Sequence, residues 1–403
     1  MTGAAAALPR RDGTGRRGTG TLVLALAGLS ALGQFASNVY LPSIPAIARD
    51  LGVPVAGVQA TLAVFLAAFA LGQLAAGPLA DRLGRRAMIR GGLGLFLAGT
   101  VAGLVADDLL ALHAARVVQG LGAAATIVAG RAVARDLFEG AELARVLALV
   151  TIAFALVPGL TPLLGGGLEA LGGWRWTFAA TAAFGLLVAL GARGITEGAR
   201  PITGAEATQS TPHVYLGLLG DRRFRRPALA SAAAFAAMSA FFAGSPVVFL
   251  ERLGVTPLEY GLYPPLAVSG FVVGGLAVRR LAGRVPPDRL MALGARVMVL
   301  AAAAMTVLPM AGLVHKHAFN AGMVAFVSGL GVVLPLAVAA ALTPFGHVAG
   351  RAAAMLGFLQ MGGGALGALA VPAALTAFPV AGFAVVMLAA VGTGAAWLAL
   401  DRG

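Results

Sequence analysis

Cysteine is absent from this 403-residue chain, and charged residues make up only 11% of it. Without cysteine there is no disulfide, no catalytic thiol and no thiolate metal ligand. Soluble globular proteins carry about 25% charged residues, so the low charge content excludes an ordinary soluble domain. The chain instead has 59% hydrophobic residues and 57 glycines, a composition typical of helices that pack closely in lipid. We therefore expect an all-α membrane protein.

Long apolar runs determine the expected architecture. Runs of about 20 residues, which suffice to cross a hydrocarbon core of about 30 Å, recur twelve times along the chain. We predict transmembrane helices at 21–43, 55–79, 87–106, 109–130, 143–168, 174–193, 227–250, 258–281, 289–312, 318–342, 350–374 and 378–400.

The grouping of these runs predicts two halves. A longer polar stretch separates the first six runs from the last six. The similar strings GPLADR (77–82) and GGLAVR (274–279) end the second and eighth runs, which favours pseudo-symmetric repeats. The expected organisation is a cytoplasmic tail at 1–20, a six-helix bundle at 21–193, a cytoplasmic linker at 194–226 and a second six-helix bundle at 227–403.

The basic residues indicate the orientation of the chain. With both termini in the cytoplasm, 23 of the 29 Lys and Arg residues fall on the cytoplasmic side and 4 in outer loops. This asymmetry follows the positive-inside rule. We expect a multi-pass protein of a bacterial cytoplasmic (inner) membrane, and interpret the net charge of +13 as orientation rather than as a nucleic-acid surface. The first run is longer than the apolar core of a signal peptide, so we expect it to be retained.

The loop after the second run contains a charged motif. It reads GPLADRLGRR at residues 77–86. Asp81 can pair with an arginine or with the partly positive N-terminus of a neighbouring helix, and a contact made in only one conformation would act as a latch. The alternative is a solvated loop that obeys the positive-inside rule. The residues of this predicted conformational switch are Gly77, Asp81, Arg82, Gly84, Arg85 and Arg86.

This string resembles the loop motif of the major facilitator superfamily. RVVQG (116–120), VPGLTPLLGG (157–166) and GWRWTF (173–178) are similar to further motifs of that superfamily. YLPSIP (40–45), DRRFRRPALA, FFAGSPVVF and PFGHVAGRAAAMLGFLQ (344–360) resemble its bicyclomycin/chloramphenicol-resistance family of drug:proton antiporters. The resemblance implies the twelve-helix fold and export of small drugs, chloramphenicol- or bicyclomycin-like compounds among them, by alternating access in exchange for protons.

The fifth run has a motif of its own. Pro158 and Pro162 each remove a backbone donor, which a spanning helix tolerates where neighbouring groups satisfy the freed carbonyls. Gly165 and Gly166 follow and permit close helix approach. The motif predicts a kink and a smooth packing face on which one half can rock against the other. A kink without functional consequence is the alternative.

Arg116 lies about seven residues inside the fourth run, roughly 10 Å deep at 1.5 Å per residue. An arginine at such depth is costly and is expected to face a cavity or a partner, with snorkelling to the surface as the alternative. All 16 Asp and Glu residues fall in loops or at the ends of runs, so no acid is available at that depth.

Asn38 is the polar group at matching depth on the first run. In the family that this chain resembles, the local string carries an aspartate that is taken to exchange the proton, whereas this sequence reads NVYLP. An amide forms hydrogen bonds but does not titrate. This departure bears on proton coupling and leaves the expected fold and transport unchanged.

The remaining candidates would line a central cavity. Gln34 lies one turn before Asn38 on the same face, and Gln119 follows Arg116 on the fourth run. The opposite, mostly apolar wall is predicted to consist of Met238, Phe241, Phe242, Phe358, Gln360 and Met361. Packing within the bundles is the alternative interpretation of these apolar side chains.

The sequence predicts a secondary transporter without catalytic residues, metal or cofactor. The five histidines are scattered, and neither a phosphate-binding glycine loop nor an ATPase motif is present, so a gradient must supply the energy, with the proton as the expected coupling ion. We expect a monomer in the lipid bilayer. One alternative is a carrier of an anionic metabolite that uses Arg116; another is a sensor or a membrane enzyme on the same fold.

Overall fold

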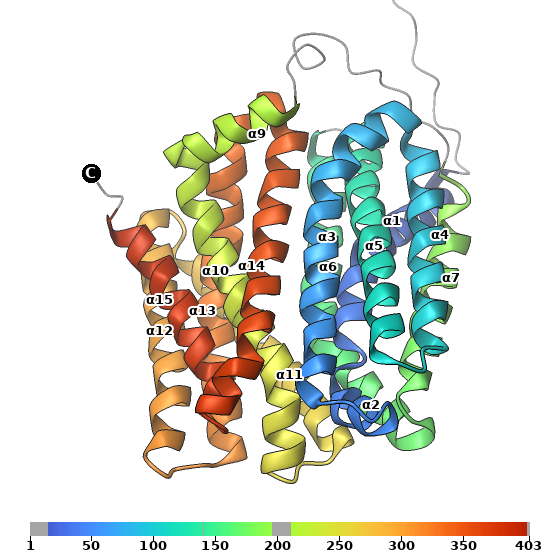
Figure 1. The fold of residues 1–403 in the computed structure, drawn as a ribbon. Coiled ribbons are helices and arrows are strands. Elements are labelled where there is room, and N and C mark those ends of the chain that lie inside the picture. Colours follow the sequence, from blue (N-terminus) through green and yellow to red (C-terminus); the bar gives the residue numbers. More distant parts are fainter. Residues whose placement is uncertain (1–14, 139, 196–210, 401–403) are drawn as a thin grey trace, which may run out of the picture.

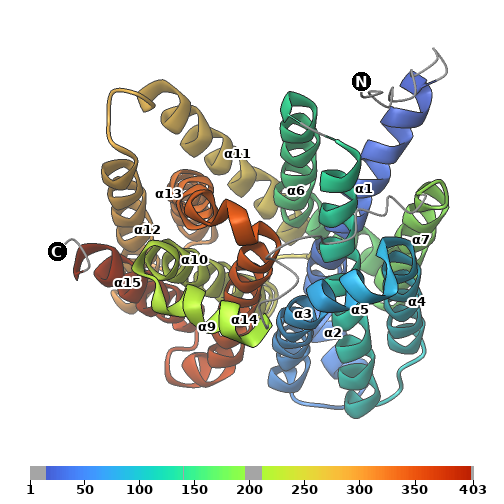
Figure 2. The same ribbon diagram turned by 90° about the horizontal axis from the view of Figure 1, so that it is seen from above.

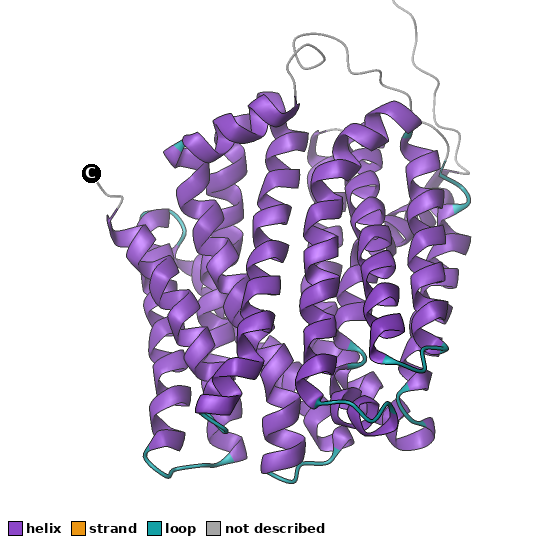
Figure 3. Ribbon diagram, in the orientation of Figure 1, coloured by secondary structure: helices purple, strands orange, loops and turns teal. Residues whose placement is uncertain are grey.

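A computed structural model describes residues 15–138, 140–195 and 211–400 of the chain. In these ranges every regular element is a helix and no strand occurs (Figure 3). The all-α fold expected from the composition is confirmed.

Within its described residues, the first half contains seven α-helices. Pro42 and Pro45 follow the first of them, and the chain turns there into a short 3-10 helix and a short α-helix instead of continuing straight. The elements are α1 (Gly15–Asn38), η1 (Leu41–Ser43), α2 (Ile44–Asp50), α3 (Val55–Leu83), α4 (Arg85–Leu104), α5 (Leu109–Leu137), α6 (Gly140–Gly172) and α7 (Arg175–Ala192).

The second half repeats the pattern of long helices. Its elements are α9 (Thr211–Gly220), α10 (Arg222–Pro246), η2 (Val247–Arg252), α11 (Pro257–Leu281), α12 (Pro287–Met310), α13 (Lys316–Leu342), η3 (Thr343–Val348), α14 (Ala349–Ala377) and α15 (Gly382–Leu400).

Each of the twelve predicted apolar runs overlaps one α-helix of the structure, although the first run, 21–43, extends past the end of α1 at Asn38. Within the described residues, ten helices are long and apolar enough to cross a membrane, and the helix at 382–398 is a shorter apolar one. The number of crossings, the bundle boundaries and the cytoplasmic position of the termini remain predictions.

The expected linker at 194–226 is helical in its described part. It contains α9 and the beginning of α10, so α10 starts earlier than the predicted boundary at residue 227. The physical reason is a helix cap, because the side chain of Asp221 accepts a hydrogen bond of 2.7 Å from the backbone N–H of Arg223. Residues 196–210 lie outside the described part.

The helices form two bundles that stand side by side (Figures 1 and 2). One contains α1 to α7 and the other α10 to α15, and they meet where α3 packs on α14 and α6 packs on α11. Within each bundle, glycines allow very close helix contacts. A Cβ on Gly122 of α5 would collide with the backbone nitrogen of Phe96 on α4.

Candidate functional site

A cavity of about 570 Å³ lies between the two bundles. Its lining comes from α1, α3, α5 and α6 of the first bundle and from α10, α11, α13 and α14 of the second. The volume falls in the range of about 300–1,000 Å³ that is usual for small-molecule sites, and most of the lining side chains are apolar.

Most of the residues predicted for a central cavity come together here. Those that line it are Gln34, Asn38, Met238, Phe241, Phe242, Gln360 and Met361. Arg116, Gln119 and Phe358 are not among the lining residues, and Phe358 packs against the apolar core.

Asn38 is 2% exposed and ends α1 at the cavity wall. Its Nδ2 donates to the carbonyl oxygen of Gln34 at 2.7 Å and to Oγ of Ser37 at 3.0 Å. Its Oδ1 has no hydrogen-bond partner among the described residues. Since buried polar atoms are normally satisfied, this oxygen is an unsatisfied acceptor buried beside the cavity.

Arg116 is enclosed within the first bundle and is 1% exposed. Its Nη1 donates to the carbonyl oxygen of Ala36 on α1 at 3.0 Å and to Oε1 of Gln119 at 2.6 Å. Its guanidinium lies 4.3 Å from the ring centroid of Tyr40 and 4.6 Å from that of Phe65, where cation–π attraction offsets part of the cost of burial.

The contacts of Arg116 differ from the pairing that its depth suggested. Nε and Nη2 have no hydrogen-bond partner among the described residues, and neither does Oδ1 of Asn38. Arg116 therefore connects α5 to the backbone of α1, where it holds the segment that ends in Asn38. The side chain does not snorkel, whereas Arg296 on α12 is exposed.

Two arginines that the sequence analysis counted only for membrane orientation also line the cavity. Arg131 and Arg135 lie one turn apart on α5, on the same face of the helix. Arg131 lies roughly 22 Å along α5 from Arg116. We call the end of the bundles near Arg131, Arg135 and Arg85 the Arg-rich end, since Arg85 pairs with Asp136 there. The spacing of four residues between Arg131 and Arg135 was readable from the sequence, but their orientation toward the cavity was not.

The end of the bundles opposite Arg131 is closed by α6. This helix runs through both Pro158 and Pro162, and Oγ1 of Thr161 donates to the carbonyl of Val157 at 2.8 Å. A Cβ on Gly165 would collide with the carbonyl of Val39, and one on Gly166 with the carbonyl of Pro257 on α11. The two glycines thus allow α6 to touch the end of α1 and the other bundle.

The loop motif at residues 77–86 lies at the Arg-rich end. Gly84 separates α3 from α4 and has a φ of +86°, a backbone angle that only glycine adopts readily. Arg85 forms an ion pair of 3.3 Å with Asp136 of α5. A Cβ on Gly77 would meet no described atom within 4 Å, so no close helix approach occurs at that glycine in this conformation. The side chain of Asp81 lies outside the described part of the structure.

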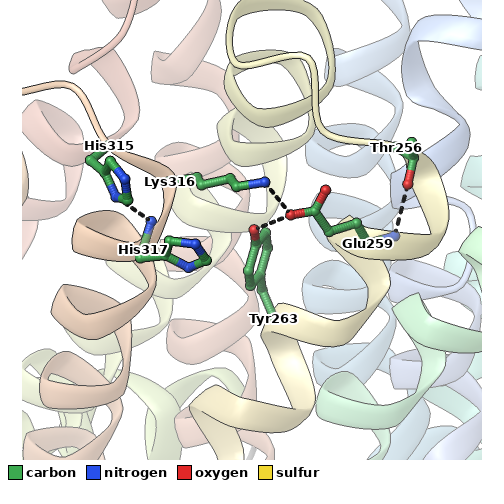
Figure 4. A network of polar contacts seen from close by, with 6 residues as sticks. All are labelled: Thr256, Glu259, Tyr263, His315, Lys316 and His317. Atoms are coloured by element: carbon green, nitrogen blue, oxygen red, sulfur yellow. Dashed lines mark hydrogen bonds and ion pairs between the residues drawn. The ribbon is translucent and has the colours of Figure 1, made fainter.

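A polar network covers the opposite end of the second bundle (Figure 4). Nζ of Lys316 lies 2.6 Å from Oε1 of Glu259, which also accepts from the hydroxyl of Tyr263 at 2.9 Å. Nδ1 of His315 accepts from the backbone N–H of His317 at 3.3 Å and caps α13. The network joins the starts of α11 and α13. Among the described residues, no cluster of three potential metal ligands is found.

One hydrogen bond crosses between the bundles near the closed end. Nε2 of Gln59 on α3 donates to the carbonyl oxygen of Ala243 on α10 at 2.8 Å, and both residues are buried. A conformation that opens this end has to break the bond.

We therefore expect Gln59→Leu to favour the conformation that is open at this end about fivefold, since a typical hydrogen bond contributes about 1 kcal/mol. Because the chain has no native cysteine, spin labels on Ala56→Cys and Arg252→Cys report the separation of these ends by pulsed electron resonance. Gln360→Leu is the matched control, because it removes a bond to Ser231 within the second bundle. An unchanged distance distribution in Gln59→Leu would contradict the prediction.

Comparison with known families matches the Major Facilitator Superfamily over residues 25–368. The chain belongs to the major facilitator superfamily. It is 31% identical to Multidrug resistance protein D of Escherichia coli K12, over 86% of this chain and 88% of that protein. It is 28% identical to Multidrug resistance protein MdtL of Escherichia fergusonii, over 82% of each.

The fold is also similar to that of a solved transporter structure. The crystal structure of a D-xylose-proton symporter superposes with a TM-score of 0.75 at 14% identity, over 94% of this chain and 97% of that one. The chain is therefore a transporter and not an enzyme, and a multi-pass protein of the inner membrane.

Proposed function

We propose that this member of the superfamily exports small, largely apolar molecules, drugs among them, by alternating access. The observation that carries the proposal is the drug-sized apolar cavity, which lies between the two bundles and is lined by both. The names of the relatives at 31% and 28% identity support drugs as the substrate class. The motifs YLPSIP and PFGHVAGRAAAMLGFLQ support assignment to the bicyclomycin/chloramphenicol-resistance family.

The two ends of the cavity differ in this conformation. The lining reaches Arg135 near the end of α5 and Leu342 near the end of α13, both at the Arg-rich end. At the other end, Gly166 contacts Pro257 and the bundles touch. If the Arg-rich end is cytoplasmic, as the positive-inside rule requires, this conformation receives substrate from the cytoplasm.

A gradient drives the cycle, and we propose the proton as the coupling ion. The described lining of the cavity contains no Asp, Glu or His. The proton site therefore belongs outside the cavity, with Asp81 and His113 as candidates. His113 on α5 is half-buried, and its Nε2 lies 3.2 Å from the carbonyl oxygen of Gly57 on α3.

A drug-susceptibility panel tests this function in a bacterial host that lacks its own exporters. Expression is expected to raise the inhibitory concentration of at least one small apolar drug, and a protonophore is expected to abolish the accumulation difference. The control is an empty vector with the protein level in membranes checked by immunoblot. If the protein is present in membranes, no drug in the panel changes its potency and reconstituted vesicles show no counterflow, the proposal that this transporter exports small apolar drugs is wrong.

A further inference from the structure

The cavity is electropositive at one end. Its described lining contains two cationic side chains, Arg131 and Arg135, and no carboxylate. The nearest acid in sequence, Asp136, is engaged by Nε of Arg85 at 3.3 Å. No hydrogen bond or ion pair of Arg131 or Arg135 occurs among the described residues. Two positive charges thus face the cavity without a neutralising partner in its wall.

The second bundle comes close to these arginines at the same end. A Cβ on Gly350 of α14 would lie 3.8 Å from Nη1 of Arg135, so α14 approaches α5 there. The Arg-rich end of the cavity is thus bounded by both bundles.

The rest of the cavity wall has a different character. Leu334 and Val338 of α13 and Leu356 of α14 are apolar, and Phe241 and Phe242 of α10 continue the apolar wall toward the closed end. The cavity therefore has a cationic part at the Arg-rich end, followed by a long apolar part that extends toward the closed end.

We propose that the cavity selects amphiphilic monoanions, whose carboxylate lies on Arg131 and Arg135 and whose apolar body lies along α13, α14 and α10. The inference rests on the proposed transport function and specifies its substrate class. A guanidinium binds a carboxylate through two parallel hydrogen bonds. Two arginines that line the cavity and form no hydrogen bond or ion pair among the described residues attract an anion and repel a cation of the same shape.

This substrate class also accounts for the missing carboxylate. An exporter that binds a cation and a proton alternately at one site needs a titratable acid in the cavity, whereas this chain has Asn38 there. An anion that leaves a cell with a negative interior moves down the electrical gradient. Its export needs no protonated acid in the cavity, and an amide is sufficient.

Three probes of the same shape test the inference: 8-phenyloctanoate, 8-phenyloctanamide and 8-phenyloctylamine. Binding to the full chain in lipid nanodiscs is measured by titration calorimetry, with empty nanodiscs subtracted for partition into lipid. We expect the carboxylate to bind about tenfold or more tightly than the amide, and the amine to bind most weakly. Adventitious binding to lipid alone gives no difference between loaded and empty discs and would overturn the inference.

Variants of α5 assign the preference to the arginines. Arg131→Gln and Arg135→Gln are each expected to reduce the carboxylate preference, and the double variant to remove it. Arg131→Lys retains part of it, which separates loss of charge from loss of fold. Arg296→Gln is the matched control, because it removes an exposed arginine on α12 that does not line the cavity. A preference that survives in the double variant, or equal binding of the three probes by the wild type, would overturn the inference.

Transport of the same probes distinguishes failure of the anion selectivity from failure of the proposed export function. If vesicles transport the amide or the amine but not the carboxylate, the proposed export function stands and the proposed anion selectivity is wrong. If vesicles transport none of the probes and none of the drugs from the susceptibility panel, both the export function and the anion selectivity are wrong.

Discussion

Arg116→Ala is expected to insert and accumulate in the membrane as the wild type does, and to lose transport. Removing the guanidinium also removes the cost of burying a charge, which offsets much of the lost contact energy. We expect the substitution to impair transport by displacing the end of α1. Nη1 of Arg116 bonds to Gln119 and to the backbone of Ala36, two residues before Asn38. Hydrogen bonds to a charged group contribute about 1.5–3 kcal/mol, so we expect transport to fall by about 10- to 100-fold.

The measurement is initial transport rate per folded protein, with thermal stability recorded alongside. Arg296→Ala is the control, since it removes an exposed arginine of similar expected depth. Arg116→Lys keeps the charge without the planar fork and is expected to recover only part of the rate. Full transport in Arg116→Ala would show that the link between α5 and α1 has no role in the cycle.

The helices were predictable because lipid imposes one requirement on all of them. A segment that crosses the bilayer must satisfy its backbone internally and be apolar for about 20 residues, and these features are visible in one dimension. The helix α9 was missed because its apolar stretch is short and lies between polar residues. The early start of α10 was missed because the capping Asp221 lies inside a basic string that the positive-inside rule explained by itself.

The site was less predictable, because its contacts join residues far apart in the chain. The depth of Arg116 predicted a polar or acidic partner, but its guanidinium also lies against the aromatic rings of Tyr40 and Phe65, and a contact with a ring has no distinctive sequence pattern. Gln59 was not singled out, because the acceptor of its hydrogen bond is a backbone carbonyl 184 residues away. A backbone acceptor leaves no mark on the sequence.

Asn38→Asp is expected to make export of neutral or cationic drugs respond to a pH gradient and to weaken export of anions. Nδ2 of Asn38 now donates to the carbonyl oxygen of Gln34 at 2.7 Å. A protonated aspartic acid can donate to the same oxygen, whereas an ionised aspartate cannot. The neighbouring carbonyl thus favours the protonated form, while the buried guanidinium of Arg116, whose Nη1 donates to the carbonyl oxygen of Ala36 two residues away, favours the ionised form. A site with opposed preferences can bind a proton in one conformation and release it in the other.

The test is uptake into proteoliposomes with an imposed pH gradient, with the drug and the proton flux measured together. Asn38→Thr is the control, because it removes the amide and retains a hydrogen-bonding side chain without introducing an acid. We expect a gradient-dependent gain in Asn38→Asp alone, together with a weaker response to 8-phenyloctanoate, since a carboxylate fixed in the cavity repels the substrate carboxylate. If the wild type already moves a proton with each neutral drug molecule and Asn38→Asp changes neither flux, then Asn38 is a structural amide that holds the end of α1. The coupling group would then lie outside the cavity, where His113 bridges α5 toward Gly57 on α3.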